Sequence, residues 1–263
     1  MPHDRRDWYD TPLYYDIVFD GGSAHEAAFL ETVWNIFGEN SRTRRVLEPA
    51  CGSGRLLLEM ASRGWSVSGF DGNEKMLAFG KERLVREGLK GRLWPDWMQS
   101  FSLPKTERFD LAHCLVSTFK YLRTEADALA CLQRVSGCLK PGGIFALGLH
   151  LTDPANPKHE HERWTARRDD IEVVCNTRTW PADPKTRLED LRTRLKITHA
   201  GRTRIQETRW QFRTYTARQL KTLLRKVPDL ELQVCYDFTY DVDSPRELDD
   251  SYADIILILR KTS

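Results

Sequence analysis

The residues of this chain best suited to hold a ligand are two glycines and, one strand and one helix later, an acid. Gly52 and Gly54 follow the apolar segment 45–48, and because glycine has no Cβ, the backbone there can come close to a bound molecule. The helix predicted over 55–63 adds unpaired N–H groups at the same point. Asp71 ends the next apolar segment, where a carboxylate can accept both hydroxyls of a ribose. The spacing therefore predicts a ligand that contains a nucleoside.

Two classes of nucleotide site begin with such a turn. A dinucleotide fingerprint requires Gly-x-Gly-x-x-Gly, in which the third glycine lets helix and strand pack closely. The third position here is Leu57, so that fingerprint is incomplete. An acid, Glu48, instead precedes the run Cys51-Gly52-Ser53-Gly54.

This segment resembles the first motif of the class I S-adenosylmethionine-dependent methyltransferases. Three later segments resemble motifs of the same family in the same order: Pro95-Asp96-Trp97-Met98, FDLAHCLVSTFKYL at 109–122, and Leu139-Lys140-Pro141-Gly142-Gly143. The resemblance covers roughly residues 13–149. It implies a Rossmann-like fold and an enzyme that consumes S-adenosylmethionine and releases S-adenosylhomocysteine.

The resemblance also implies which positions surround this cofactor. The residues of the first motif would border its methionine part, Asp71 would hold the ribose, and Gly72 would allow close approach. Asp96 would meet the adenine amino group, while Met76 fits either the adenine pocket or plain packing between helix and sheet. The implied cofactor contacts are Glu48, Ala50, Gly52, Gly54, Asp71, Gly72, Met76, Asp96, Trp97, Met98 and Leu115.

Methyl transfer needs placement of the acceptor, and a base only if the acceptor arrives protonated. Tyr15 precedes the first predicted helix, where many small-molecule methyltransferases fold an aromatic ring over the active site. Tyr121 follows the fourth predicted strand, at a position resembling one where amino-sugar N-methyltransferases carry a histidine. His150 directly follows the fifth strand and is suited to act as a base near neutral pH. These three are the catalytic candidates, although Tyr15 and His150 also fit purely structural roles.

Two neighbouring features limit the chemistry. Residues 116–119 (Val-Ser-Thr-Phe) lack the Asn/Asp-Pro-Pro-aromatic motif of enzymes that methylate adenine or glutamine amino nitrogens, which argues against those substrates. His159 and His161 have no ordered set of further ligands around them, so we expect a surface loop there and no metal.

Apolar segments and amphipathic helices alternate through the first half of the chain. Ser23 and Glu26 have the form of a capping box that would start the first helix, and Gly38 would end it. Alternation predicts a parallel sheet covered on both faces, with ligands outside the carboxyl ends of its strands. The predicted strands are 45–48, 67–71, 92–94, 109–115 and 143–149, and the helices after the first are 55–63, 74–87 and 125–139.

The alternation stops after residue 149. Residues 152–170 are rich in charge and proline and are expected to form an exposed connection, followed by strands at 171–180, 187–199 and 202–215. A helix at 216–227 and strands at 232–236 and 252–259 complete the chain. The fold class is thus α/β: a Rossmann-like, doubly wound, mostly parallel seven-stranded sheet, with an antiparallel β insert between the fifth strand and the last helix. Residues 1–151 and 216–263 form the cofactor domain, and 152–215 form the insert, a substrate roof or dimer contact.

The insert is strongly basic. Arg192, Arg194 and Lys196 alternate with apolar or hydroxyl residues, so their charges share one strand face. A solvated outer face accounts for them, and so does a wall for an anionic substrate or nucleic acid. Trp210 and Phe212 share a face that suits either a pocket or a dimer contact.

Composition places the chain among cytoplasmic globular proteins. It has 263 residues, 40% hydrophobic content and a net charge of +2. No apolar run is long enough to span a membrane, and no signal peptide is evident. The six cysteines form no Cys-x-x-Cys pair, which favours reduced, buried thiols.

The sequence therefore predicts methyl transfer to nitrogen or oxygen of a small molecule, by a monomer or homodimer. Three alternatives stay open. One is a methyltransferase that acts on RNA or protein through the basic insert. The others are a non-catalytic protein that binds S-adenosylmethionine, and a nucleotide-dependent oxidoreductase.

Overall fold

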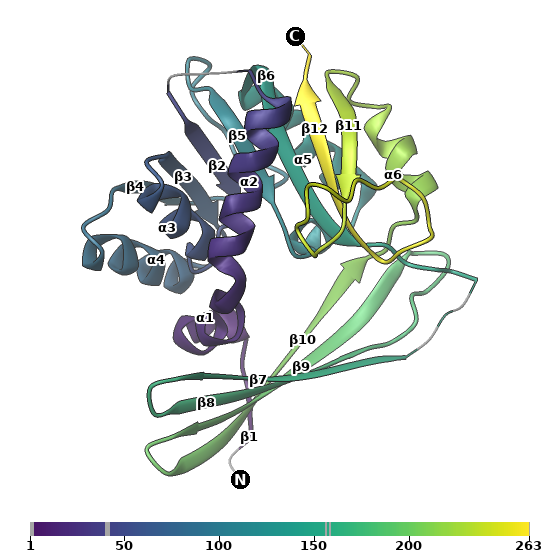
Figure 1. Cartoon of the computed structure of the whole chain (residues 1–263). Coiled ribbons are helices and arrows are strands. Elements are labelled where there is room, and N and C mark those ends of the chain that lie inside the picture. The colour runs from purple at the N-terminus through teal and green to yellow at the C-terminus, as the bar shows by residue number, and fades with distance from the viewer. Residues whose placement is uncertain (1–2, 40–42, 156, 158, 263) are drawn as a thin grey trace.

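The computed structural model of the chain describes residues 3–39, 43–155, 157 and 159–262 and contains two β-sheets (Figure 1). The larger sheet has seven strands in the order β11-β12-β6-β5-β2-β3-β4. Only β12 runs antiparallel to its neighbours, so the predicted mostly parallel sheet is confirmed. Its strands are β2 (Arg45–Pro49), β3 (Ser66–Asp71), β4 (Gly91–Pro95), β5 (Phe109–Cys114), β6 (Leu139–His150), β11 (Leu230–Tyr236) and β12 (Asp254–Lys261).

Helices cover both faces of this sheet, because successive strand residues point to opposite sides. Val46 packs in the core beneath α2 (Ser23–Phe37), α3 (Arg55–Ser62) and α4 (Glu74–Arg86). Leu47 packs in the core beneath α5 (Glu125–Cys138) and α6 (Ala217–Leu224). β4 lies at the edge of the sheet and is partly exposed. The strand predicted from residue 143 begins earlier, because the motif at 139–143 is the start of β6 itself, with Gly142 at a φ of +74°.

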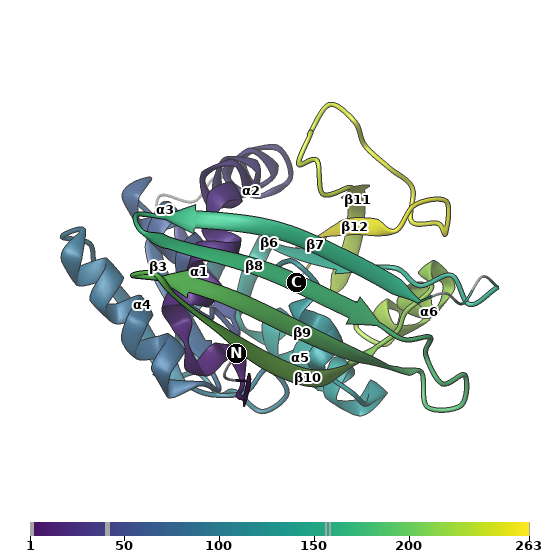
Figure 2. The ribbon, with the colours of Figure 1, turned by 90° about the horizontal axis from the view of Figure 1, so that it is seen from below.

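The smaller sheet lies across the carboxyl ends of the larger one (Figures 1 and 2). Its order is β1-β10-β9-β8-β7, with β1 (His3–Arg5), β7 (Glu160–Arg168), β8 (Ile171–Thr179), β9 (Leu188–His199) and β10 (Arg202–Arg213). The last three are the predicted insert strands. β7 was expected to be an exposed connection, and that expectation is wrong. Trp164 and Ala166 alternate inward among exposed polar residues. With only two inward apolar residues in a highly charged segment, the alternation typical of a strand was not recognised in the sequence.

The first residues of the chain also join the smaller sheet. β1 pairs in parallel with β10, opposite residues Ile205–Glu207. β1 was assigned to the cofactor domain and β10 to the insert, so this pairing crosses the proposed boundary. The assignment of residues 1–151 to the cofactor domain stays a prediction.

A helix unforeseen in the sequence, α1 (Pro12–Phe19), lies between the two sheets (Figure 1). It starts with Pro12 in its first turn, a position that suits proline, and leads through a short 3-10 turn into α2. The expected capping box is wrong, because Gly22 is the N-cap of α2 and no side chain caps it. Ser23 and Glu26 instead accept hydrogen bonds from Arg55.

A third, small core joins α1 to the inner face of the smaller sheet. Ile17 of α1 packs with Val173, Leu195 and Trp8. All six cysteines are free and buried, as predicted. Within the described ranges, no helix combines the length and the apolar character that a membrane span requires.

Candidate active site

A cavity of about 1000 Å³ lies between the two sheets. Its floor is the carboxyl ends of β2, β5 and β6, which contribute Glu48, Leu115 and His150. Its roof is the inner face of the smaller sheet, including Trp210, and Tyr15 of α1 closes one side. The cavity thus lies where parallel sheets of this kind bind ligands.

The glycine turn has the backbone conformation that its sequence suggested. Gly52 and Gly54 have φ values of +53° and +69°, in the region that glycine adopts most readily. The Gly52 N–H donates to Asp71 Oδ2 at 2.8 Å, and the Asn73 N–H donates to Asp71 Oδ1 at 2.8 Å. Asp71 therefore ties the end of β3 to the turn after β2. Burial raises its pKa, and these two bonds oppose that shift.

The predicted cofactor contacts fall into two groups. Glu48, Ala50, Gly52 and Leu115 border the cavity. The others lie beside it at the ends of β3 and β4 or in the adjoining turn and helix; they are Gly54, Asp71, Gly72, Met76, Asp96, Trp97 and Met98. Their contact with a ligand remains a prediction.

Four members of the second group, Asp71, Gly72, Asp96 and Trp97, contact one another. Trp97 is 61% exposed, and its ring lies so close to Gly72 that a Cβ there would come within 2.6 Å of it. The Asp96 N–H donates to the carbonyl of Asp71 at 3.3 Å, and Asp96 Oδ1 accepts from the Trp97 N–H at 2.9 Å. Met76 is fully buried.

Of the three catalytic candidates, two are tyrosines that line the cavity. Tyr15 lies within α1 rather than before the first helix, with its ring 5.2 Å from that of Trp8. The Tyr121 and Tyr9 hydroxyls share a hydrogen bond of 2.7 Å. Burial raises the pKa of all three tyrosines. They therefore stay protonated near neutral pH, available as hydrogen-bond donors but not as bases.

His150 borders the same cavity and is held by an acid. It stands directly opposite Asp254 in the β6–β12 pairing, and cross-strand partners present their side chains on one face. His150 Nδ1 lies 2.6 Å from Asp254 Oδ1. Because an ionised carboxylate only accepts hydrogen bonds, Nδ1 carries a hydrogen, and Nε2 is the nitrogen that holds the lone pair of the neutral ring.

Several cavity residues had no signal in the sequence. Tyr9 reaches Tyr121 only because the N-terminal segment crosses the roof, and Asp254 reaches His150 only through strand register. Lys120 pairs with Glu189 of β9 at 2.7 Å in the cavity wall. Within a single sequence, such partners are too far apart to be linked by spacing.

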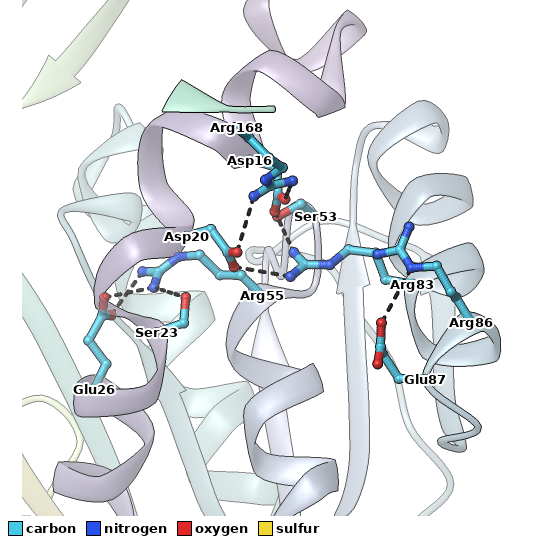
Figure 3. Close-up of polar contacts among 10 residues, drawn as sticks. All are labelled: Asp16, Asp20, Ser23, Glu26, Ser53, Arg55, Arg83, Arg86, Glu87 and Arg168. Carbon is cyan, nitrogen blue, oxygen red and sulfur yellow. Dashed lines mark hydrogen bonds and ion pairs between the residues drawn. The ribbon is translucent and has the colours of Figure 1, made fainter. Parts of the chain in front are cut away.

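Charged side chains anchor α1 beside the glycine turn (Figure 3). Asp16 is fully buried; it accepts from Ser53 Oγ at 2.8 Å, from Arg168 of β7 at 2.8 Å, and from Arg83 of α4. Asp20 accepts from the same two arginines at 3.0 and 3.1 Å. We call these five residues the α1 anchor. It joins α1, α4, the glycine turn and the smaller sheet.

Of the two histidines expected in a surface loop, His159 is exposed and lies in the connection before β7, whereas His161 lies in the strand itself. His161 pairs with Asn176, and both His159 and His161 border the cavity. Among the described residues, no group of three or more His, Cys, Asp or Glu side chains is arranged to hold a metal.

Arg192, Arg194 and Lys196 do not border the cavity, whereas Arg168 of β7 bonds to Asp16 of α1. Strand register puts Arg178, Arg192 and Arg209 directly opposite one another across β8, β9 and β10, and none of them borders the cavity. The adjacent Trp210 and Phe212 do. The sequence left open whether this face of β10 forms a pocket or a dimer contact. In the structure, its two aromatic side chains form part of the cavity wall.

Comparison with known proteins identifies the core of the fold. A family model described as "Methyltransferase domain" matches residues 46–143, which run from β2 to the start of β6. Residues 46–143 are therefore similar to a methyltransferase domain. The glycine/sarcosine N-methyltransferase of Aphanothece halophytica is 31% identical over 105 residues, 40% of this chain and 39% of that enzyme. The chain thus spans well under half of that relative's length in this match.

Solved structures extend the likeness to the whole chain. An S-adenosylmethionine-dependent methyltransferase from Clostridium acetobutylicum matches with a TM-score of 0.73 and 16% identity, over 95% of this chain and 97% of that one. CalS10 of Micromonospora echinaspora, an amino pentose methyltransferase solved with S-adenosylmethionine bound, matches with a TM-score of 0.69 and 21% identity, over 92% and 93%. At these identities the likeness shows the fold, which this chain shares with both S-adenosylmethionine-dependent methyltransferases.

The cavity of this chain suits S-adenosylmethionine in two observable ways. At Gly52, an added Cβ would lie 3.7 Å from Met76 Cε and 4.0 Å from Tyr15 Cε1, so the missing side chain leaves a narrow cradle beside the turn. Glu48 Oε2 is buried without a hydrogen-bond partner among the described residues, and a ligand ammonium would satisfy it.

Proposed function

We propose that the chain transfers the methyl group of S-adenosylmethionine to the nitrogen of a small molecule that carries an amine. The charge of the cavity carries this proposal. Among the described residues, its lining includes eight carboxylates and three lysine or arginine side chains. The carboxylates are those of Glu48, Asp153, Glu160, Glu162, Asp183, Glu189, Asp250 and Asp254.

The three cations are already engaged. Arg55 is held by Glu26 at 2.7 Å and Lys120 by Glu189 at 2.7 Å. Arg187 donates to the carbonyl of Thr214 at 2.7 Å. A surplus of carboxylates favours cationic ligands, and aromatic side chains around them, including Trp164 and Trp210, add to this preference. An amine with an apolar body fits both features. CalS10 is likewise named for an acceptor that carries an amine, an amino pentose.

Bound S-adenosylmethionine would supply a methyl group that its sulfonium already activates. The side chains of this protein would exclude water, orient the acceptor nitrogen and take its proton. His150 is suited to the last task, because Asp254 holds its Nδ1 and leaves the Nε2 lone pair. The protonated tyrosines Tyr15 and Tyr121 would orient the acceptor rather than ionise.

A direct test is methyl transfer from labelled S-adenosylmethionine to matched pairs of aromatic and aliphatic amines and their hydroxyl counterparts. We expect label on the amine member of a pair and stoichiometric S-adenosylhomocysteine. Label on the hydroxyl member alone would contradict nitrogen as the target.

The base is tested by His150→Gln. If the amine arrives as an ammonium, kcat/KM at pH 7 should fall by about a hundredfold, and the loss should shrink at alkaline pH, where the amine arrives neutral. Asp254→Asn should give a smaller loss with the same dependence on pH. His199→Gln is the control, since His199 pairs with Asp170 outside the cavity. A loss that is equal at all pH values would rule out proton transfer by His150.

The same assay addresses the alternatives. Transfer to RNA or protein, with binding that weakens steeply as salt increases, would favour a macromolecular acceptor on the basic outer face. Tight binding of S-adenosylhomocysteine without transfer to any acceptor would favour a non-catalytic protein.

A further inference from the structure

We propose that Glu48 carries a proton in the empty methyltransferase domain and releases it to water when the cationic end of the cofactor binds, and that Glu26 causes this by occupying Arg55. The inference rests on the proposed cofactor site. It adds that cofactor binding is coupled to the release of one proton.

The first observation is that Glu48 is buried with an unused oxygen. It is 9% exposed at the end of β2, where it borders the cavity. Its Oε2 has no partner among the described residues, and its Oε1 has His113 Nδ1 as a neighbour at 3.8 Å. An ionised carboxylate in such surroundings needs a cation or several hydrogen bonds to compensate its lost hydration.

The second observation is that the nearest cation is neutralised elsewhere. Arg55 at the start of α3 makes two parallel bonds to Glu26 of α2, at 2.7 and 2.8 Å, and a third to Ser23 (Figure 3). A bidentate pair of this kind uses the full charge of the carboxylate against that of the guanidinium. Glu48 is therefore a second acid beside a cation that is already paired.

The other groups that face Glu48 offer no compensation. They are Asp71 from β3, Tyr15 from α1, Cys51 from the glycine turn, and His113 and Cys114 from β5. Asp71 adds negative charge, and burial keeps the tyrosine and both thiols protonated by raising their pKa.

His113 stays neutral as well. It is fully buried, and neither ring nitrogen has a partner within the described part of the chain. Burial, with a smaller contribution from Arg55, lowers the pKa of His113 to about 3. Burial likewise raises the pKa of Glu48 well above its usual range, with Arg55 opposing and Glu26 and Asp71 reinforcing that shift.

The proposed step is balanced. The O–H bond of the Glu48 carboxyl breaks, its proton passes to water, and the carboxylate pairs with the ammonium of the cofactor's methionine part. Since each cofactor bound then displaces one proton, affinity should rise about tenfold per pH unit below the pKa of Glu48 in the empty protein.

The test is calorimetric titration of the full chain with S-adenosylhomocysteine at pH 6, in buffers that differ in ionisation enthalpy. The slope of the observed enthalpy against that of the buffer counts the protons released. We expect close to one proton per ligand for the wild type and none for Glu48→Gln, which mimics the protonated carboxyl.

A second variant tests the cause. Glu26→Gln frees the charge of Arg55 for Glu48, so Glu48 should already be ionised and proton release should fall well below that of the wild type. Glu31→Gln is the matched control on the same helix, because Glu31 pairs instead with Arg63, and its release should equal that of the wild type.

The outcomes separate this inference from the proposed function. Failure of the wild type to bind S-adenosylhomocysteine would refute the cofactor site itself. Binding with no proton release, or with equal release by wild type and Glu48→Gln, would overturn the inference while leaving the cofactor site intact.

Discussion

His113 has an influence on stability that is separate from ligand binding. Its pKa is lowered from an ordinary value of 6.5 to about 3, because the buried ring cannot be hydrated when charged. The unfolded chain takes up a proton at this residue below about pH 6.5, whereas the folded protein does not. The neutral ring thus favours the folded state above pH 6.5, and this advantage is lost progressively as the pH falls toward 3.

We therefore expect the free energy of unfolding of His113→Leu to depend less on pH below pH 6.5 than that of the wild type. Between pH 6.5 and 5, the wild type should lose about 2 kcal/mol more of its unfolding free energy than the variant does. Urea denaturation at several pH values measures this. Glu48 is present in both proteins, so its opposite dependence on pH cancels in the difference. Parallel profiles would contradict the role of His113.

Individual residues also set the limit of what the sequence could predict about the site. Glu48, Gly52 and Leu115 were predictable because strand ends in a parallel sheet meet at one edge, so local spacing is sufficient. Tyr9 and Asp254 were not, since each reaches its partner, Tyr121 or His150, through contacts between distant segments.

At the scale of elements, the position of α1 depends on the α1 anchor. Replacing one partner of a buried ion pair leaves the other charge uncompensated. Asp16→Asn should therefore lower the free energy of unfolding by about 3 to 5 kcal/mol, and it should speed hydrogen exchange in α1 and at the end of β7 near Arg168. Chemical denaturation and exchange mass spectrometry measure the two effects.

The matched control lies one turn further along α4. Arg86 pairs with the neighbouring, solvent-exposed Glu87 (Figure 3), and exposed pairs contribute little. Arg86→Met should change stability by less than about 0.5 kcal/mol. Similar losses for the two variants would show that the anchor contributes no more than a surface pair.

Elements also show where sequence patterns succeed and fail. Strands such as β2 and β3 were predicted to within a residue or two, because each is a short segment with buried apolar residues that ends just before a turn. α1 and β7 were missed for opposite reasons. The apolar residues of α1 stand among aromatics and acids without a clear stripe, and β7 places only Trp164 and Ala166 inward from an otherwise charged surface.

At the scale of the whole molecule, charge is segregated although the net charge is only +2. Acids gather in the cavity between the sheets, and bases gather on the outer face of the smaller sheet. On that face Arg178, Arg192 and Arg209 occupy directly opposed positions on three adjacent strands, where Glu207 pairs with Arg209 and lies 4.0 Å from Arg192. Like charges placed opposite one another destabilise a sheet.

Relieving this repulsion should stabilise the protein. Arg178→Glu places an acid directly opposite Arg192, and we expect a gain of about 0.5 kcal/mol at low ionic strength that fades as salt screens the charges. Thermal denaturation across a salt series measures it. Lys90→Glu, the same charge change at an exposed site before β4, should bring no comparable gain; equal gains would point to net charge as the cause.

The pairing of β1 with β10 has a consequence for the order in which the molecule matures. The Trp8 N–H donates to Thr208 Oγ1, a residue 200 positions further along the chain. During synthesis Trp8 leaves the ribosome 200 residues before Thr208, and contacts this distant in sequence form slowly. Trp8 and Tyr9 complete the roof of the cavity only after that pairing. A nascent chain can therefore assemble the glycine turn and most of the larger sheet long before it has an enclosed place for an acceptor.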